Sequence, residues 1–327
     1  MRTFRKIVGR TLLVLLLAFL IVPFLIPVNT SGTLTNVEAA GAQATFVELA
    51  GLQVHTEEII SSNKCKCEQP LIVLMHGFGA STFSWREVIE PLSAFGDVIA
   101  YDRPGFGFTQ RPTEWGQVNP YGFEGNFLLL DSIIEKYATS NQVILIGHSA
   151  GGQLAAEYAR LNPNKVSGLV LVDPAILTTG QSPSWLNWIL NIPQVDRIGP
   201  LLVKSISESG NDLLRQSFYD PESVTQEVFE GYNKVLKVKE WERAFWNFTK
   251  APRDNDLAAN LESVTQPILL ITGERDTVVP TSDTVKLADI FPNSSLEIIK
   301  KSAHLPQEEQ PQDFMTAIEN HWEELVA

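Results

Sequence analysis

Cysteine is nearly absent from this chain of 327 residues, in which Cys65 and Cys67 are the only two. Two cysteines are too few for a disulfide framework, and the second pair that a structural zinc site would need is missing. We expect both to lie in a loop. The sequence also lacks a Walker loop, a Gly-x-Gly-x-x-Gly nucleotide fingerprint and clustered metal ligands, so neither a cofactor nor a metal is expected.

Basic residues are in the minority, with 25 Lys and Arg against 38 Asp and Glu, and the formal net charge is -13. The basic residues at the N-terminus precede the first acid, so the rest of the chain is more acidic still. Such a surface would repel nucleic acid, because affinity for its backbone comes chiefly from cationic side chains that release counterions. Nucleic acid is therefore excluded as a partner.

One long hydrophobic run is present, TLLVLLLAFLIVPFLIPV at residues 11–28, and it follows a basic stretch. As a helix it would reach about 27 Å at roughly 1.5 Å per residue, enough to cross a bilayer. We predict a membrane anchor over residues 1–28, with the N-terminus in the cytoplasm and the rest of the chain outside. The alternative is a cleaved signal peptide, which would leave a secreted protein. Small-x-small sites at 40–42 and 42–44 lie far beyond the apolar run, which favours the anchor.

Residues 29–44 are small and polar and are predicted to form a linker. Beyond them, short apolar runs begin near residues 45, 54, 71, 98, 143, 169, 268 and 296. Most are separated by amphipathic stretches of helical length, a pattern typical of a parallel sheet covered by helices on both faces. We therefore predict an α/β fold with a mainly parallel eight-stranded sheet, built from residues 45–174 and 262–327.

The alternation of strand and helix lapses between residues 175 and 261, where no comparable strand occurs. Four of the seven tryptophans lie there: Trp185, Trp188, Trp241 and Trp246. Aromatic-rich helices are suited to cover an apolar substrate cavity. We predict that residues 175–261 form a helical cap over the sheet.

A Gly-x-Ser-x-Gly motif occupies residues 147–151, directly after a predicted strand and before a predicted helix. A serine on such a tight turn has strained backbone geometry, and the flanking glycines remove Cβ atoms that would clash. Ser149 is therefore the candidate nucleophile. The amide of Ala150, at the start of the helix, is placed to donate to a developing oxyanion, and the amide of Phe78 in the His-Gly-Phe-Gly segment is the second candidate donor.

A base for the serine must come from five histidines: His55, His76, His148, His304 and His321. His304 follows the last predicted strand, in a loop from which its side chain can reach the carboxyl edge of the sheet. We predict that it is the base. His76 is expected to form a structural hydrogen bond, and His55 and His321 are expected to be surface or packing residues.

An acid should orient the imidazole and stabilise its charged form. Asp276 follows the next-to-last strand and gives the chain order serine, acid, histidine. Asp173, which also ends a strand, is the alternative acid. We favour Asp276 and expect the other carboxyl to form a structural hydrogen bond.

Together these residues resemble the α/β-hydrolase fold family, over nearly everything from residue 45 to 327. The motifs that carry the resemblance are HGFG at 76–79, DRPGFG at 102–107, GHSAG at 147–151, GERD at 273–276 and AH at 303–304. The resemblance implies Ser149 as nucleophile, His304 as base, Asp276 as acid, and the Phe78 and Ala150 amides as oxyanion donors.

Within that family, dehalogenases and epoxide hydrolases carry aspartate where this chain has Ser149, which argues against both activities. The resemblance instead favours a serine hydrolase that cleaves an acyl ester in a small-molecule substrate, of the esterase or lipase kind. The tryptophan-rich cap indicates that the acyl group is apolar. Two alternatives stay open. One is a hydrolase of carbon–carbon bonds with the same fold, and the other is a ligand-binding member without activity.

Overall fold

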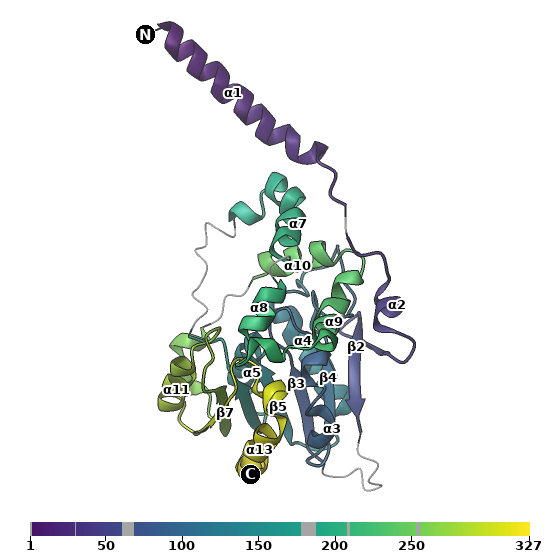
Figure 1. Ribbon diagram of the computed structural model, residues 1–327, viewed down its shortest axis with the longest axis vertical. Helices are drawn as coiled ribbons and strands as arrows, with labels where there is room; N and C mark the ends of the chain where they lie inside the picture. The colour runs from purple at the N-terminus through teal and green to yellow at the C-terminus, as the bar shows by residue number, and fades with distance from the viewer. Residues whose placement is uncertain (1, 30, 61–68, 178–187, 208–209, 253–255) are drawn as a thin grey trace.

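The computed structural model describes residues 2–29, 31–60, 69–177, 188–207, 210–252 and 256–327 (Figure 1). Cys65, Cys67 and Trp185 lie outside the described residues. The strands are β1 (Thr45–Leu49), β2 (Leu52–Ile59), β3 (Leu71–Met75), β4 (Asp97–Tyr101), β5 (Val143–His148), β6 (Gly168–Val172), β7 (Ile268–Gly273) and β8 (Ser294–Ile299). The helices are α1 (Arg2–Leu25), α2 (Asn36–Ala40), α3 (Ile89–Leu92), α4 (Phe123–Tyr137), α5 (Ala150–Leu161), α7 (Pro193–Ser207), α8 (Gly210–Gln216), α9 (Gln226–Asn233), α10 (Trp241–Lys250), α11 (Thr281–Ile290), α12 (Pro306–Glu309) and α13 (Pro311–Val326).

The eight strands form one sheet in the order β1-β2-β4-β3-β5-β6-β7-β8. β1 pairs with β2 and β2 with β4 in antiparallel fashion, and the strands from β4 to β8 along the sheet are parallel. Every residue of β3, β5 and β6 is buried. Burial on both faces explains their near-continuous runs of Val, Ile and Leu, because a parallel strand in the middle of a sheet is covered by helices on each side. The predicted fold is confirmed.

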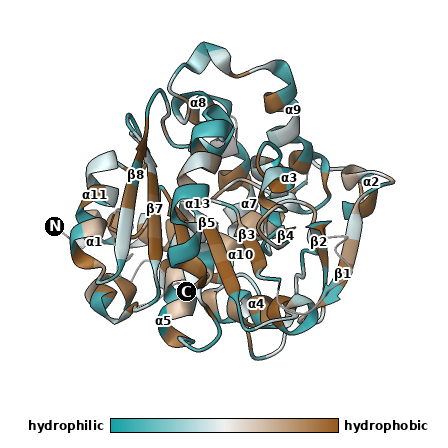
Figure 2. Cartoon of the chain, turned by 90° about the horizontal axis from the view of Figure 1, so that it is seen from below, coloured by the Kyte–Doolittle hydropathy of each residue, from teal (hydrophilic) through white to brown (hydrophobic). Residues whose placement is uncertain are grey.

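Two hydrophobic cores lie on opposite faces of the sheet, since successive side chains of a strand point to opposite sides. Leu145 of β5 belongs to a cluster that includes residues of α4, α5 and α11, whereas Ile144 and Ile146 belong to one that includes residues of α3 and α13. Figure 2 shows the hydrophobic central strands surrounded by helices that carry hydrophilic residues. The arrangement holds the loops at the carboxyl ends of the parallel strands in fixed positions.

The segment between β6 and β7 contains helices α7, α8, α9 and α10, which gather at one end of the sheet (Figure 1). We refer to the described residues of this segment as the cap. Trp241 and Trp246 of α10 are buried and pack with Val203 of α7, so they form a small core within the cap. The expected tryptophans thus stabilise the packing of the cap helices, apart from Trp188, whose side chain is 70% exposed.

Helix α1 projects away from the rest of the molecule (Figure 1). Phe4–Leu25 is long and apolar enough to cross a membrane, and only 6% of its most apolar window is buried. The predicted linker, residues 29–44, contains the short helix α2. Thr35 and Glu38 form a reciprocal cap at the start of α2, and Asn36 donates hydrogen bonds to the backbone oxygens of residues 108 and 109.

Candidate active site

Ser149 lies on the turn between β5 and α5 with φ 52° and ψ −117°. A positive φ is rare for a residue other than glycine and indicates a constrained backbone. Contacts with the neighbouring strands hold the backbone of Ser149 in this conformation. The Ser149 amide donates to Val172 O (2.8 Å), and a Cβ on Gly151 would lie 2.1 Å from the backbone oxygen of Met75. The sequence motif predicts this turn because only glycine fits at that contact.

His304 and Asp276 meet at the carboxyl edge of the sheet, on the loops that follow β8 and β7. His304 Nδ1 lies 2.6 Å from Asp276 Oδ2, and both side chains are buried. Asp276 Oδ1 accepts hydrogen bonds from the amides of Val278 (2.8 Å) and Val279 (3.1 Å). The two amides therefore hold Oδ1 in place, and Oδ2 is the oxygen that contacts the imidazole.

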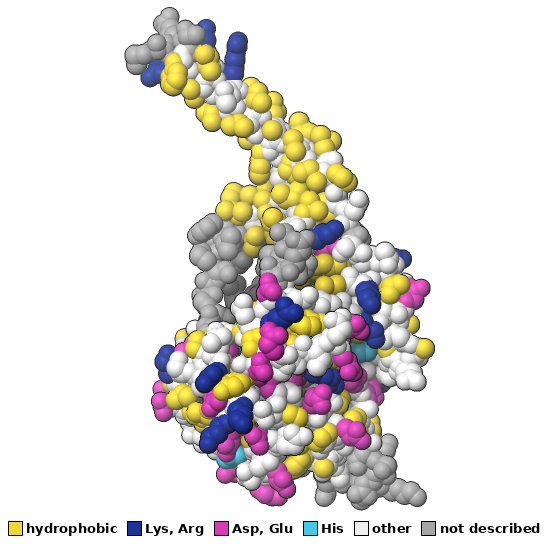
Figure 3. All heavy atoms as spheres, viewed as in Figure 1, with side chains coloured by type: hydrophobic (Ala, Val, Ile, Leu, Met, Phe, Trp, Pro, Cys, Tyr) yellow, Lys and Arg dark blue, Asp and Glu magenta, His cyan; other side chains and the backbone are white. Residues whose placement is uncertain are grey.

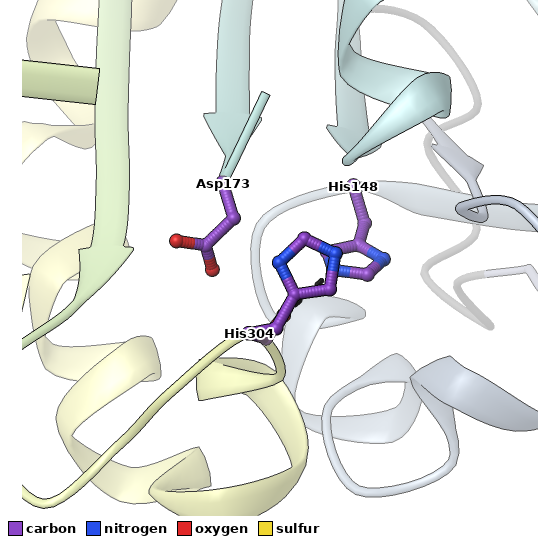
Figure 4. Close-up of side chains that lie close together, drawn as sticks. All are labelled: His148, Asp173 and His304. Carbon is purple, nitrogen blue, oxygen red and sulfur yellow. Dashed lines mark hydrogen bonds between the residues drawn. The ribbon is translucent and has the colours of Figure 1, made fainter. Parts of the chain in front are cut away.

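Asp173 is the second carboxyl at this edge, directly after β6. Figure 4 shows it converging with His148 and His304, and the ligating atoms of these three residues lie within 4.8 Å of one another. Asp173 Oδ1 accepts hydrogen bonds from the Thr272 hydroxyl (2.6 Å) and the Gly273 amide (3.3 Å). Burial, and then the nearby Asp276, raise the pKa of Asp173 well above its usual range, and its Oδ2 has no hydrogen-bond partner among the described residues.

His148, the variable residue of the motif, stacks against the imidazole of His304 with ring centroids 4.7 Å apart. Its Nε2 donates to the backbone oxygen of His304 (2.7 Å). Burial lowers the pKa of His148 well below its usual range, so the ring stays neutral. The other ring nitrogen, His148 Nδ1, has no hydrogen-bond partner among the described residues.

The remaining histidines have other partners. His76 Nε2 accepts a hydrogen bond from the Arg103 amide (3.0 Å), and its Nδ1 donates to Gly77 O (2.8 Å), as expected for a structural residue. Burial, with Arg103 nearby, lowers the pKa of His76 to about 3. His55 packs in the interior with Asp102 (2.9 Å), and His321 contacts carboxylates on the surface.

Two amides are expected to stabilise an oxyanion. Ala150 follows Ser149 and is the first residue of α5, and Phe78, in the loop after β3, lines the same cavity as Ser149. Within the described part of the chain, neither amide donates a hydrogen bond to a protein acceptor. Both remain available to a ligand oxygen, and the N-terminal end of α5 adds a partial positive charge there.

A cavity of about 290 Å³ opens above Ser149 and His304. Its wall is mostly apolar, and the cap supplies much of it through Val203, Leu213, Leu214, Leu236, Trp241 and Phe245. Arg111 is a cation in this wall. Its Nη2 donates to Gly107 O (2.6 Å), whereas its Nε and Nη1 have no partner among the described residues. The cavity can therefore hold an apolar group beside a few polar contacts.

Sequence reasoning missed the contacts that join the His304 loop to the cap. The His304 amide donates to Ser217 O (2.9 Å), and the Tyr219 amide donates to Glu309 Oε2 (2.5 Å). The Tyr232 hydroxyl donates to Glu308, which also contacts Arg86 Nη1 at 2.6 Å. These pairs are more than 70 residues apart in sequence, so no local pattern could indicate them. These hydrogen bonds link the His304 loop to the cap.

Burial raises the pKa of Glu308 to about 7 despite its contact with Arg86. The folded pKa lies above the ordinary value of 4.5, so folding takes up a proton between these values. We expect this group to contribute stability that is complete below pH 4.5 and lost as pH rises through 7. The free energy of unfolding should fall with a slope of at most about 1.4 kcal/mol per pH unit. Denaturant unfolding of the wild type and Glu308→Gln from pH 4 to 8 checks this, and parallel curves would contradict it.

Comparisons with known proteins agree with this geometry. The family model of the alpha/beta hydrolase fold matches residues 70–311. The chain is 25% identical over 265 residues to the monoacylglycerol lipase ABHD6 of Homo sapiens, covering 77% of each chain. It is 26% identical over 298 residues to the 2-hydroxy-6-oxo-2,4-heptadienoate hydrolase of Pseudomonas putida, covering 87% of this chain and 97% of that one.

The solved structure of the meta-cleavage product hydrolase CumD from Pseudomonas fluorescens IP01 has the same fold, with a TM-score of 0.65 and 22% identity. It covers 86% of this chain and 97% of its own. Since the family model spans about three quarters of the sequence, from the strand before the Phe78 loop to the residues after His304, it includes every predicted site residue. The chain belongs to the α/β-hydrolase fold family.

Proposed function

We propose that this protein is a membrane-anchored serine hydrolase that cleaves acyl esters with an apolar acyl group. One observation carries the proposal. Ser149, on a strained turn, and His304, hydrogen-bonded to Asp276, both border one mostly apolar cavity. An activated serine needs a base within reach and a group that orients the base, and these residues supply all three roles.

In this mechanism His304 Nε2 takes the proton of the Ser149 hydroxyl as Oγ attacks the ester carbonyl. The Phe78 and Ala150 amides donate to the resulting oxyanion, and Asp276 stabilises the charged imidazolium. His304 then gives its proton to the leaving alcohol, which leaves an acyl-enzyme. Water attacks the acyl carbon, with His304 again acting as base, and the acid and free Ser149 are released.

The location proposed for the enzyme rests on α1 and on the segment that follows it. Basic residues precede the apolar span, which supports an N-terminus in the cytoplasm and a catalytic domain outside. If a signal peptidase cut at 42 or 44, the folded domain would lose α2, whose Ala39 is buried, and its hydrogen bonds to residues 108 and 109. Their packing supports a retained anchor over a secreted form.

Carbon–carbon bond cleavage is the second candidate, favoured by Arg111. The carboxylate of a dienoate such as the one named for the Pseudomonas putida relative could pair with this cation in the cavity wall. The same serine and histidine would act, but the bond cleaved would join a carbonyl to a carbon chain.

Substrate profiling distinguishes the two candidates. We expect the full chain in detergent to hydrolyse a neutral monoacylglycerol with a kcat/KM at least about tenfold above that for a 2-hydroxy-6-oxo-dienoate, a difference of about 1.4 kcal/mol. Arg111→Leu should change kcat/KM for the monoacylglycerol less than about tenfold. Faster turnover of the dienoate, lost in Arg111→Leu, would replace the proposal with the second candidate.

A further inference from the structure

The chain that leaves α1 is attached to the cap rather than to the sheet. The Ser31 amide and hydroxyl donate to Glu242 Oε1 (2.7 and 2.5 Å), and Trp241 Nε1 donates to Ser31 Oγ (2.9 Å). The Thr33 amide donates to Lys237 O (2.9 Å). A Cβ on Gly32 would lie 1.9 Å from the oxygen of Val238, so this close backbone pairing requires glycine.

Little chain separates the end of the apolar span from this attachment. Only five residues lie between Leu25 and Ser31. In addition, Arg197 of α7 donates through Nη2 to the oxygen of Ile26 (3.3 Å), one of the carbonyls left unpaired at a helix end. Helices α1 and α7 are in contact. The cap therefore has to lie at the level where the span leaves the bilayer.

The same end of the cap exposes apolar side chains. Leu202 of α7 is 51% exposed and Trp188, just before that helix, is 70% exposed. In Figure 3 hydrophobic atoms continue from α1 onto the adjoining part of the cap. Tryptophan is favoured at the membrane interface because it has an apolar ring and a polar N–H group.

This surface is also close to the cavity. Val203, next to Leu202 on α7, is buried and lines the cavity, as does Leu213 of α8, which is 46% exposed. Helices α7 and α8 thus present side chains both to the outside and to the space above Ser149. A lipid that entered between them would not have to cross water.

We propose that Trp188 and Leu202, here called the membrane face, insert into the surface of the bilayer that α1 spans, and that the acyl substrate enters the cavity from that bilayer between α7 and α8. The occupant of the membrane face is a phospholipid surface. The inference about the substrate rests on the proposed ester hydrolysis, whereas the inference about the surface does not.

The experiment uses the full chain, its intact mass checked, in phosphatidylcholine vesicles. Fluorescence quenching by phosphatidylcholine brominated on its acyl chains reports the position of Trp188. We expect stronger quenching of the wild type than of Trp188→Phe. Equal quenching of the two proteins, or a mature chain that lacks residues 1–25, would overturn the proposed surface, whatever the enzyme hydrolyses.

Route of entry is tested with two esters, a long-chain ester dissolved in the vesicles and a short-chain ester added in water. Leu202→Asp should lower turnover of the first at least tenfold and change the second less than twofold. The matched control is Leu161→Asp, at the far end of α5, where leucine is 52% exposed; neither rate should change. Equal effects of Leu202→Asp on both esters, or on neither, would overturn entry from the bilayer. Absence of any ester turnover would instead refute the proposed function.

Discussion

Ser149→Ala is expected to lower kcat for ester hydrolysis by a factor on the order of 10⁶, with little change in the free energy of unfolding. The hydroxyl is the atom that forms the covalent bond, so no other side chain can replace it. The fold should persist because alanine keeps the same backbone, including the amide bond to Val172 and the contact at Gly151. Steady-state kinetics on a p-nitrophenyl ester measure kcat, and denaturant unfolding measures the free energy of unfolding.

Labelling by a fluorophosphonate probe tests the same residue independently of any substrate, because the probe reacts only with an activated serine. Wild type should label, and Ser149→Ala and His304→Ala should not. Ser223→Ala is the matched control, since among the described residues this exposed serine hydroxyl bonds a nearby backbone oxygen, Asp220 O. Labelling of folded Ser149→Ala, or none of folded wild type, would refute the proposed nucleophile.

The sheet could be predicted from the sequence because burial on both faces gives each central strand a continuous apolar run. The turn at Ser149 could be predicted for a related reason. Its glycines are required by backbone contacts within a few residues of the motif and by the neighbouring strand β3. His304 and Asp276 followed from chain order, since loops after neighbouring parallel strands meet at one edge of a sheet.

Attachment of the N-terminal segment to the cap could not be predicted in this way. Ser31 contacts Glu242 across 211 positions, and the pairing at Gly32 is between backbones, which no side-chain pattern reports. One local signal was present. Thr35 and Glu38 have the spacing of a capping box, which predicts the start of a helix within the supposed linker.

The sequence also left two acids for one histidine, and their surroundings distinguish them. Asp276 contacts His304 Nδ1 directly, whereas Asp173 accepts hydrogen bonds from the Thr272 hydroxyl and the Gly273 amide. Two carboxyls this close in the interior cannot both be ionised without a large cost. The raised pKa of Asp173 favours its neutral form, and we propose that Asp276 is the acid that orients the base.

Asp276→Asn is expected to lower kcat about 10⁴-fold, because an amide does not stabilise the imidazolium and favours the wrong tautomer. Asp173→Asn should change kcat less than about tenfold, since an amide replaces a neutral acid and also tolerates the positive φ of 45° at this position. A loss as large as that of Asp276→Asn, in a folded variant, would assign the charge to Asp173 instead.

Stability gives a second measure of the same assignment. The folded pKa of Asp173 lies above the unfolded one, so its contribution is complete below the unfolded pKa and is lost as pH rises through the folded pKa. Wild type should lose free energy of unfolding from about pH 4 upward relative to Asp173→Asn, because only the wild type must bind a proton to fold. Denaturant unfolding across pH 4 to 8 measures this difference. A pH-independent difference would mean that Asp173 is ionised in the folded state, and the assignment of the two acids would then be reversed.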